Sequence, residues 1–310
     1  MAKKKIQVAN FNVVFLEGME EAPLLQYFDT IVMPALQSGI KRISGDTSYL
    51  FTDVKIIEDE TEGYVLGGNI VKKTIIEIKS DLDSSGNLIE KDEKYPSAPY
   101  STFAIFLKNH RMLYVQNQKG SPSIQSFSAV IKYVLAKYIR QYNKYEKENP
   151  LPYPIINIIG IPRKENLEDE LKKVDRITRL TLKFYPLNGD LEFKGMFGEM
   201  LHDLRNNTGS KNGELVLKSP KSIQGVVNVI DESAATVKPI IEVVYPDKTK
   251  GKITDETFSE KMEMNFAGDN IQEIEEVVQK GKKIDTINYM TESHRQIYEK
   301  NKGKIIKFLS

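Results

Sequence analysis

The apolar positions between residues 123 and 147 recur every three or four residues, which is the spacing of one face of a helix. The apolar stripe consists of Ile124, Phe127, Ile131, Val134, Tyr138 and Tyr142. The opposite arc is basic and carries Lys132, Lys137, Arg140, Lys144 and Lys147. The pattern predicts a long amphipathic helix over 123–147. The prolines of "ENPLPYP" that follow it predict a domain boundary.

Patterns typical of β-strands dominate the sequence before this helix. A helical spacing covers 19–37, and the polar stretch 83–99 predicts an exposed loop. Strands are predicted at 6–15, 49–59, 63–83 and in a hairpin over 100–116 whose tip is Lys108–Arg111. This half of the chain therefore predicts an α+β domain over residues 1–149.

The second half alternates between strand and helix patterns. From Ile177 the predicted order is strand, helix, strand, helix, strand, strand, with the first helix over 192–207 and the last strand over 252–266. Such an order is typical of a small sheet covered by two helices. We therefore predict an α+β fold of two domains, the second being ferredoxin-like (β-α-β-α-β-β) over 155–266. A helical tail follows over 270–310.

Composition limits the chemistry that the chain can support. The 44 Lys+Arg residues offset 43 Asp+Glu, so attraction to nucleic acid must come from a local patch. The absence of cysteine excludes disulfides, thiolate zinc sites and a cysteine nucleophile. The three histidines lack ligand spacing, so we predict no metal site. No apolar run approaches the roughly 20 residues that cross a bilayer, and we expect a cytoplasmic, bacterial protein without membrane contact.

One short motif resembles part of a nuclease site. Metal-dependent nucleases of the PD-(D/E)xK type use an acidic residue and a Glu-x-Lys triplet on an adjacent strand. The two carboxylates hold Mg or Mn, and the lysine steadies the water or the phosphate. Asp53, Glu77 and Lys79 could supply this set. The alternation around Glu77 better fits an ordinary half-exposed strand, because short motifs often occur by chance. We therefore expect no catalysis and no cofactor, with the nuclease as the alternative.

The basic arc of the predicted helix is the leading candidate for binding. Lysines and arginines in a row displace counterions from phosphates and give an affinity that depends on salt but not on sequence. The candidate contacts are Lys132, Lys137, Arg140 and Lys144, with Arg111 of the hairpin tip at the edge. The alternative is a solvated helix face with no ligand.

The tail carries an apolar stripe that must be covered. Its members are Ile287, Met290, Ile297 and Tyr298. Because an apolar face is not left in water, it either docks on the body of the same chain or pairs with a second copy. The second option makes the chain an oligomeric scaffold.

Three stretches carry a resemblance: "IQVANFNVVF", the hairpin "YSTFAIFLKNHRMLYV" with its long helix, and "DRITRLTLKFYPLNGD". In these the chain resembles a little-characterised bacterial family of about this length that occurs in phage-defence gene neighbourhoods. The resemblance implies a defence role beside a separate effector protein, and it supplies no catalytic residues. We therefore expect a non-catalytic binding or sensor subunit of an anti-phage system that contacts nucleic acid or a partner protein.

Overall fold

Strand β1 (Ala2–Glu17) organises the larger of two sheets in the computed structural model, which describes residues 2–18, 20–188, 207–266 and 274–309. Its side chains alternate between two cores, with Phe11 and Phe15 in one and Ile6 and Val8 in the other. Both of its edges are paired, with β2 (Glu20–Pro23) and β8 (Arg111–Gln116) along one edge and β9 (Pro154–Gly160) and β14 (Lys261–Phe266) along the other. The strand predicted at 6–15 is confirmed, and it is buried on both faces.

The larger sheet has the order β14-β1-β8-β7-β5-β4-β3, and its neighbouring strands are antiparallel. Its other strands are β3 (Arg42–Ser44), β4 (Thr47–Asp59), β5 (Gly63–Leu82), β7 (Tyr100–Phe106), β9 (Pro154–Gly160) and β14 (Lys261–Phe266). The hairpin predicted over 100–116 is present as β7 and β8.

The helix predicted over 19–37 is shorter than expected. Residues 20–23 instead pair with the end of β1, and three short helical turns follow: η1 (Leu24–Tyr27), η2 (Phe28–Val32) and α1 (Met33–Gln37). The predicted apolar face is correct, since its side chains are all buried: Leu24, Phe28, Ile31, Val32 and Leu36. Pro34 lies within this continuous run of helical turns, next to the change from the wider turn of η2 to α1, and it supplies no backbone N–H donor.

Helix α2 (Ile124–Tyr145) covers one face of this sheet and confirms the helix predicted over 123–147. Its Phe127 is fully buried at the centre of an aromatic cluster. The ring centroid of Phe127 lies 5.0–6.3 Å from those of Phe11, Phe51, Phe103 and Tyr114. These contacts fix which side of the helix faces the sheet.

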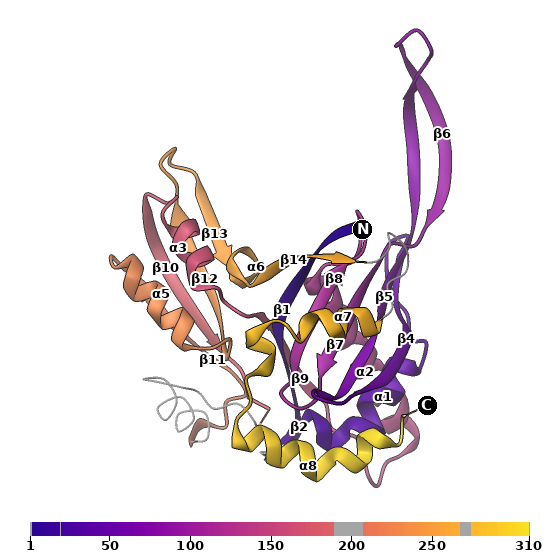
Figure 1. Cartoon of the computed structure of the whole chain (residues 1–310), viewed down its shortest axis with the longest axis vertical. Coiled ribbons are helices and arrows are strands. Elements are labelled where there is room, and N and C mark those ends of the chain that lie inside the picture. The colour runs from indigo at the N-terminus through magenta and orange to yellow at the C-terminus, as the bar shows by residue number, and fades with distance from the viewer. Residues whose placement is uncertain (1, 19, 189–206, 267–273, 310) are drawn as a thin grey trace.

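Residues 83–99, predicted as a loop, contain a strand instead. β6 (Leu88–Ser97) pairs with the outer half of β5. The two strands form a ribbon that projects away from the rest of the molecule (Figure 1). The sequence conceals this strand because its residues are charged and exposed, so no buried face imposes an apolar alternation.

The smaller sheet is antiparallel and has the order β11-β10-β12-β13. Its strands are β10 (Arg176–Phe184), β11 (Gly213–Lys218), β12 (Val237–Val244) and β13 (Lys250–Thr254). Helices α3 (Lys164–Leu171), α5 (Ile223–Glu232) and α6 (Asp255–Phe258) contribute to its core. The helix predicted over 192–207 lies almost wholly outside the described residues.

The protein is therefore α+β, but the ferredoxin-like arrangement is not confirmed. In a ferredoxin-like split β-α-β unit, the two strands are parallel and a third strand lies between them. Here β10 and β11 are adjacent and antiparallel. The single strand predicted over 252–266 is also wrong. It is two strands in different sheets, since β13 pairs with β12 and β14 pairs with β1.

The predicted domain limits of 1–149, 155–266 and 270–310 do not coincide with the division between the two sheets. Strands β9 and β14 lie in the segment expected to form the second domain, yet both pair with β1. Side-chain amides of β1 also reach the smaller unit. Asn12 Nδ2 donates to Pro186 O at 2.5 Å, and Asn10 Nδ2 donates to Ala235 O at 3.3 Å.

The tail docks on the body of the same chain. It forms α7 (Ile274–Gly281), η4 (Asp285–Asn288) and α8 (Glu292–Ile306), which lie against the larger sheet and the η1–η2 region (Figure 1). In the predicted stripe Ile287 is fully buried, Tyr298 is 6% exposed, and Ile297 packs against the core. Met290 is half-buried. The stripe is therefore covered within the chain and does not need a second copy.

Candidate nucleic-acid interface

Helix α2 is held firmly at both ends. Ser123 caps its N-terminus, because the Ser123 hydroxyl accepts a hydrogen bond from the Ser126 N–H at 3.2 Å. At the other end Asn143 holds the following loop: its Nδ2 donates to Leu151 O at 2.9 Å and its Oδ1 accepts from Leu151 N at 2.7 Å. The rigid helix therefore presents a fixed outer face.

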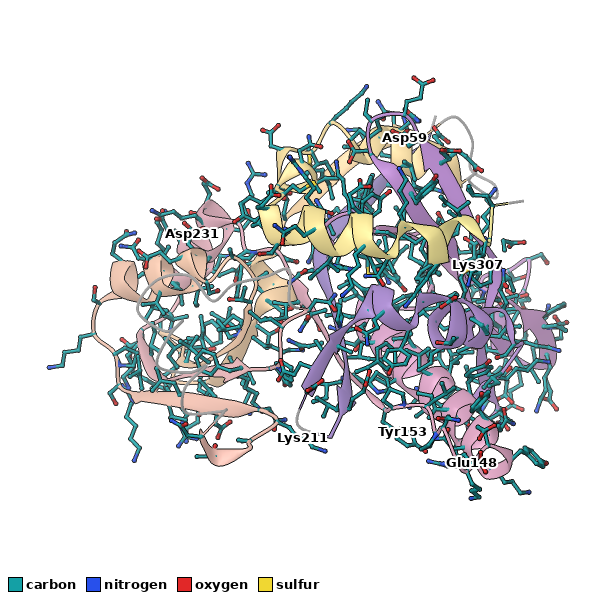
Figure 2. The ribbon with its side chains drawn as sticks, turned by 90° about the horizontal axis from the view of Figure 1, so that it is seen from below. Asp59, Glu148, Tyr153, Lys211, Asp231 and Lys307 are labelled. Carbon is teal, nitrogen blue, oxygen red and sulfur yellow. The ribbon has the colours of Figure 1, made fainter. Side chains whose placement is uncertain are left out.

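The basic arc lies on that outer face. Lys132, Arg140 and Lys144 are exposed, and Lys137 is half-buried. Figure 2 shows the end of this helix at the periphery of the molecule, where Glu148 and Tyr153 are labelled. At about 1.5 Å of rise per residue, the arc from 132 to 144 spans about 18 Å. That length matches about five nucleotides of one strand, at about 3.4 Å each along a duplex axis.

These cations have no carboxylate partner in the part of the chain that the structure describes. Neither an ion pair nor a hydrogen bond joins the basic groups of the arc to another side chain: Lys132, Lys137, Arg140, Lys144 and Lys147. Some lysines elsewhere are paired, as in Lys108 with Glu62 at 2.8 Å and Lys282 with Asp59 at 2.9 Å. None of these basic groups is therefore neutralised by a direct ion pair within the described residues, although Glu146 and Glu148 follow α2 in the sequence.

Tyrosines lie among the cations. Lys137 Nζ is 5.6 Å from the ring centroid of Tyr133, and Lys144 Nζ is 5.6 Å from that of Tyr145. Tyr133 is 38% exposed and Tyr145 is 83% exposed. Exposed rings among basic groups offer stacking surfaces for bases beside the charges that contact phosphates. These two tyrosines were not predicted from the sequence, although Tyr133 is four residues from Lys137 and Tyr145 is next to Lys144.

Lys132, near the start of the arc, lies close enough to a further lysine to interact with it. Neighbouring protein atoms remove part of the hydration of Lys132 and lower the pKa of its ammonium group, and the positive charge of Lys238 lowers it further. Lys238 belongs to β12 and also interacts with the carboxylates of Asp255 and Glu256 beside the smaller sheet. An anion placed here would relieve the repulsion between the two lysines.

Arg111 is not part of this face, and its predicted place at the edge of the interface is wrong. It is only 4% exposed, and its guanidinium lies 5.7 Å from the ring centroid of Tyr289. The hairpin tip is covered by the tail, because Asn109 Nδ2 donates to the carbonyls of Ile287 at 2.6 Å and Tyr289 at 2.9 Å. The tip was expected to be exposed, and a segment distant in sequence buries it.

Asp53, Glu77 and Lys79 are not brought together by the structure. Asp53 lies on β4 with a φ of 54°, at a register shift next to Asn69, whose Nδ2 donates to Asp53 Oδ2 at 3.1 Å. Glu77 is eight residues further along β5 than Asn69, on the projecting ribbon. Eight residues of strand span about 26 Å. No shared metal ion could contact both carboxylates.

Glu77 and Lys79 instead belong to the charge pairs of the ribbon. Lys94 Nζ lies 2.9 Å from Glu77 Oε1, and Lys79 Nζ lies 3.6 Å from Glu77 Oε2. The hydrogen bond from Lys94 lowers the pKa of the Glu77 carboxyl. Within residues 2–18, 20–188, 207–266 and 274–309, no group of three or more acidic or histidine side chains could hold a metal ion.

Comparison with known proteins identifies a matching family. Residues 4–225 match the family model described as "Domain of unknown function (DUF4747)". No curated protein matches the chain. None of the helices in the described segments is both long enough and apolar enough to span a membrane.

Proposed function

The chain belongs to the DUF4747 family, and from the geometry of α2 we propose that it is a non-catalytic protein that binds the backbone of a nucleic acid. The observation that carries the proposal is the outer face of α2, where basic side chains that have no carboxylate partner among the described residues are interleaved with exposed tyrosines. Phosphate oxygens are the ligands that such a row of cations recognises, and the rings add stacking that tolerates any base.

The separation of Asp53 from Glu77 supports binding without cleavage by these residues. The resemblance to a family of phage-defence neighbourhoods supports a role in a bacterial anti-phage system, as the recognising subunit beside a separate effector protein. In that role the chain binds nucleic acid or the effector in the cytoplasm, and a second protein acts on the target.

The proposal is tested by fluorescence anisotropy with labelled single-stranded and duplex DNA and RNA at low salt. The triple variant Lys137→Glu, Arg140→Glu, Lys144→Glu reverses the charge of the α2 face. We expect it to weaken binding by about 100-fold or more, since each lost contact with a charged group costs about 1.5–3 kcal/mol. The substituted side chains lie outside the buried stripe, so the melting temperature should change little.

A matched control reverses the same number of charges on another surface. Lys211, Lys218 and Lys221 are exposed on and beside β11, a strand of the smaller sheet. Their replacement by glutamate changes the net charge equally and should weaken binding less than threefold, because distant exposed charges are screened by salt. Equal losses in the two variants would mean that net charge alone attracts nucleic acid. No binding by the unaltered protein would reject the proposal.

A further inference from the structure

The ribbon formed by the outer half of β5 and by β6 is unusual because it exposes apolar side chains on both faces. Seven large apolar residues of the ribbon are 36–76% exposed: Ile75, Ile76, Ile78, Leu82, Leu88, Ile89 and Tyr95. A two-stranded ribbon alone in water has marginal stability, and exposed apolar patches of this kind mark sites of association. The exposed apolar side chains of the ribbon therefore indicate a site of association that is separate from the α2 face.

The register of the ribbon sorts these side chains into two different faces. Ile76 is opposite Tyr95, Ile78 is opposite Glu93, and Leu82 is opposite Leu88. Because alternate residues share a face, Ile76, Ile78, Leu82, Tyr95 and Leu88 lie on one side. The other side carries Glu77 with Lys94 and Asp81 with Lys91, each pair at 2.9 Å, together with Ile75 and Ile89. One face is thus largely apolar and the other largely charged.

The two edges of the ribbon differ in regularity. Along β6 the register passes from Ile78↔Glu93 to Ser80↔Glu90, which places a bulge in β6. A bulge interrupts pairing along its strand. The edge of β5 has no extra residue here, and its last partner in β4 along the body is Ser48, opposite Lys73. Beyond Thr74 the β5 edge offers unpaired N–H and C=O groups to a further strand.

This edge is complementary to itself. When two copies of β5 pair antiparallel about Ile78, Glu77 of each copy is opposite Lys79 of the other. The same register sets Ile78 against Ile78 and brings the apolar faces onto the same side of a four-stranded sheet. We propose that the ribbon is a homodimerisation element in which the β5 edges of two copies pair about Ile78.

The charge and the length of the ribbon favour a second copy of the chain over other binding partners for the β5 edge. Residues 74–97 carry six carboxylates and three lysines, which disfavours nucleic acid. The length of this segment is comparable to the roughly 20–30 residues that each side of a stable interface contributes. The two bodies would lie at opposite ends of the paired ribbons, because antiparallel pairing sets the tip of one beside the base of the other. The inference does not depend on nucleic-acid binding.

The first test uses the absence of native cysteine. Ile78→Cys should form an intermolecular disulfide under mild oxidation, because the two Cβ atoms would be opposite each other on the two-fold axis. Ile89→Cys, at a position of similar exposure on β6, and Tyr145→Cys, on α2, are the controls and should remain monomeric in denaturing gels. Cross-linking of Ile78→Cys no faster than of Tyr145→Cys would overturn the proposal.

The second test is a charge exchange followed by sedimentation velocity. Unaltered protein should sediment with twice the 35.4 kDa mass of one chain. Glu77→Lys and Lys79→Glu should each weaken the dimer by about tenfold, since like charges then oppose each other at two places. An equimolar mixture of the two variants should restore the dimer, because each opposed pair again has opposite charges. Monomeric unaltered protein at about 50 μM, or a mixture no better than the single variants, would reject the proposal.

Discussion

Lys282 Nζ lies 2.9 Å from both carboxylate oxygens of Asp59, so a residue after α7 is bound to the turn between β4 and β5. The Asp59 carboxylate also accepts hydrogen bonds from the N–H groups of Thr61 and Glu62, both at 3.0 Å. Its side chain is 5% exposed, and that of Lys282 is 24% exposed. This largely buried pair therefore stabilises both the turn and the attachment of the tail.

Replacing Asp59 by asparagine should destabilise the protein by about 2–3 kcal/mol. The substitution keeps the size of the side chain but removes the charge that Lys282 requires, and a buried cation left without its partner is costly. Urea denaturation followed by circular dichroism measures the difference. Glu292→Gln, which removes an exposed partner of Arg295, is the control and should change stability by less than about 0.5 kcal/mol. A similar loss in both variants would contradict the assignment.

The same pair predicts the response to acid. Burial would raise the pKa of Asp59, but the hydrogen bonds from Lys282, Glu62 and Thr61 outweigh it and hold the pKa well below its usual range. A carboxyl whose pKa is lower in the folded than in the unfolded state contributes stability at pH values above its unfolded pKa, near 4. That contribution is lost as the pH falls from the unfolded pKa toward the folded pKa. The stability of the unaltered protein should therefore fall more steeply below pH 4 than that of Asp59→Asn. Parallel pH profiles would show that the pair does not contribute.

Tyr298→Phe tests the attachment of α8. The Tyr298 hydroxyl accepts a hydrogen bond from the buried Tyr64 N–H at 3.0 Å, and it is so close to Gly63 that a Cβ there would collide with it. Removing the hydroxyl leaves the N–H without its acceptor and should cost about 1–2 kcal/mol. Tyr145→Phe on α2 removes an exposed hydroxyl and should be neutral. Equal melting temperatures for the two variants would disprove the role of this bond.

The elements with a local signal were predictable from the sequence. Helix α2 was predicted within two residues at each end, because its buried stripe repeats at helical spacing and Ser123 caps its start. Strand β6 was missed because a ribbon in water imposes no apolar alternation. A polar segment that contains prolines then looks the same whether it is a loop or a strand.

Pairing between distant segments could not be predicted. Lys4 pairs with Met264, but the sequence around either residue does not indicate which distant segment it pairs with. Arg111 was placed at an exposed tip because the covering carbonyl of Ile287 lies far along the chain. The basic residues of the candidate interface could be predicted, because their spacing in the sequence shows which residues share one side of a helix. That these basic groups form no ion pair within the described residues could be seen only after folding.

Phe127→Ala should be among the most damaging single substitutions. The ring is fully buried and contacts four other aromatic rings, so its removal leaves a cavity that these rigid neighbours cannot fill. The expected loss is about 3–5 kcal/mol in urea denaturation. Phe308→Ala is the control, because Phe308 is partly exposed and makes one edge contact with Phe28 at 6.1 Å. Phe308→Ala should cost less than half as much as Phe127→Ala. A larger loss for Phe308→Ala would show that Phe127 is not at the centre of the core.

The salt dependence of binding reports how many cations of α2 contact phosphate. Release of counterions makes the logarithm of the association constant fall linearly with the logarithm of salt, with a slope of about −0.9 per contact on duplex DNA. Contacts from Lys132, Lys137, Arg140 and Lys144 predict a slope of about −3.6, and about −2.8 on a single strand. Removing the charges of Lys137 and Arg140 by Gln substitution should make the duplex slope shallower by about 1.8, because two of the four contacts are then absent. Titrations between 50 and 200 mM salt measure the slopes, and an unaltered slope in this variant would mean that the phosphates contact another surface.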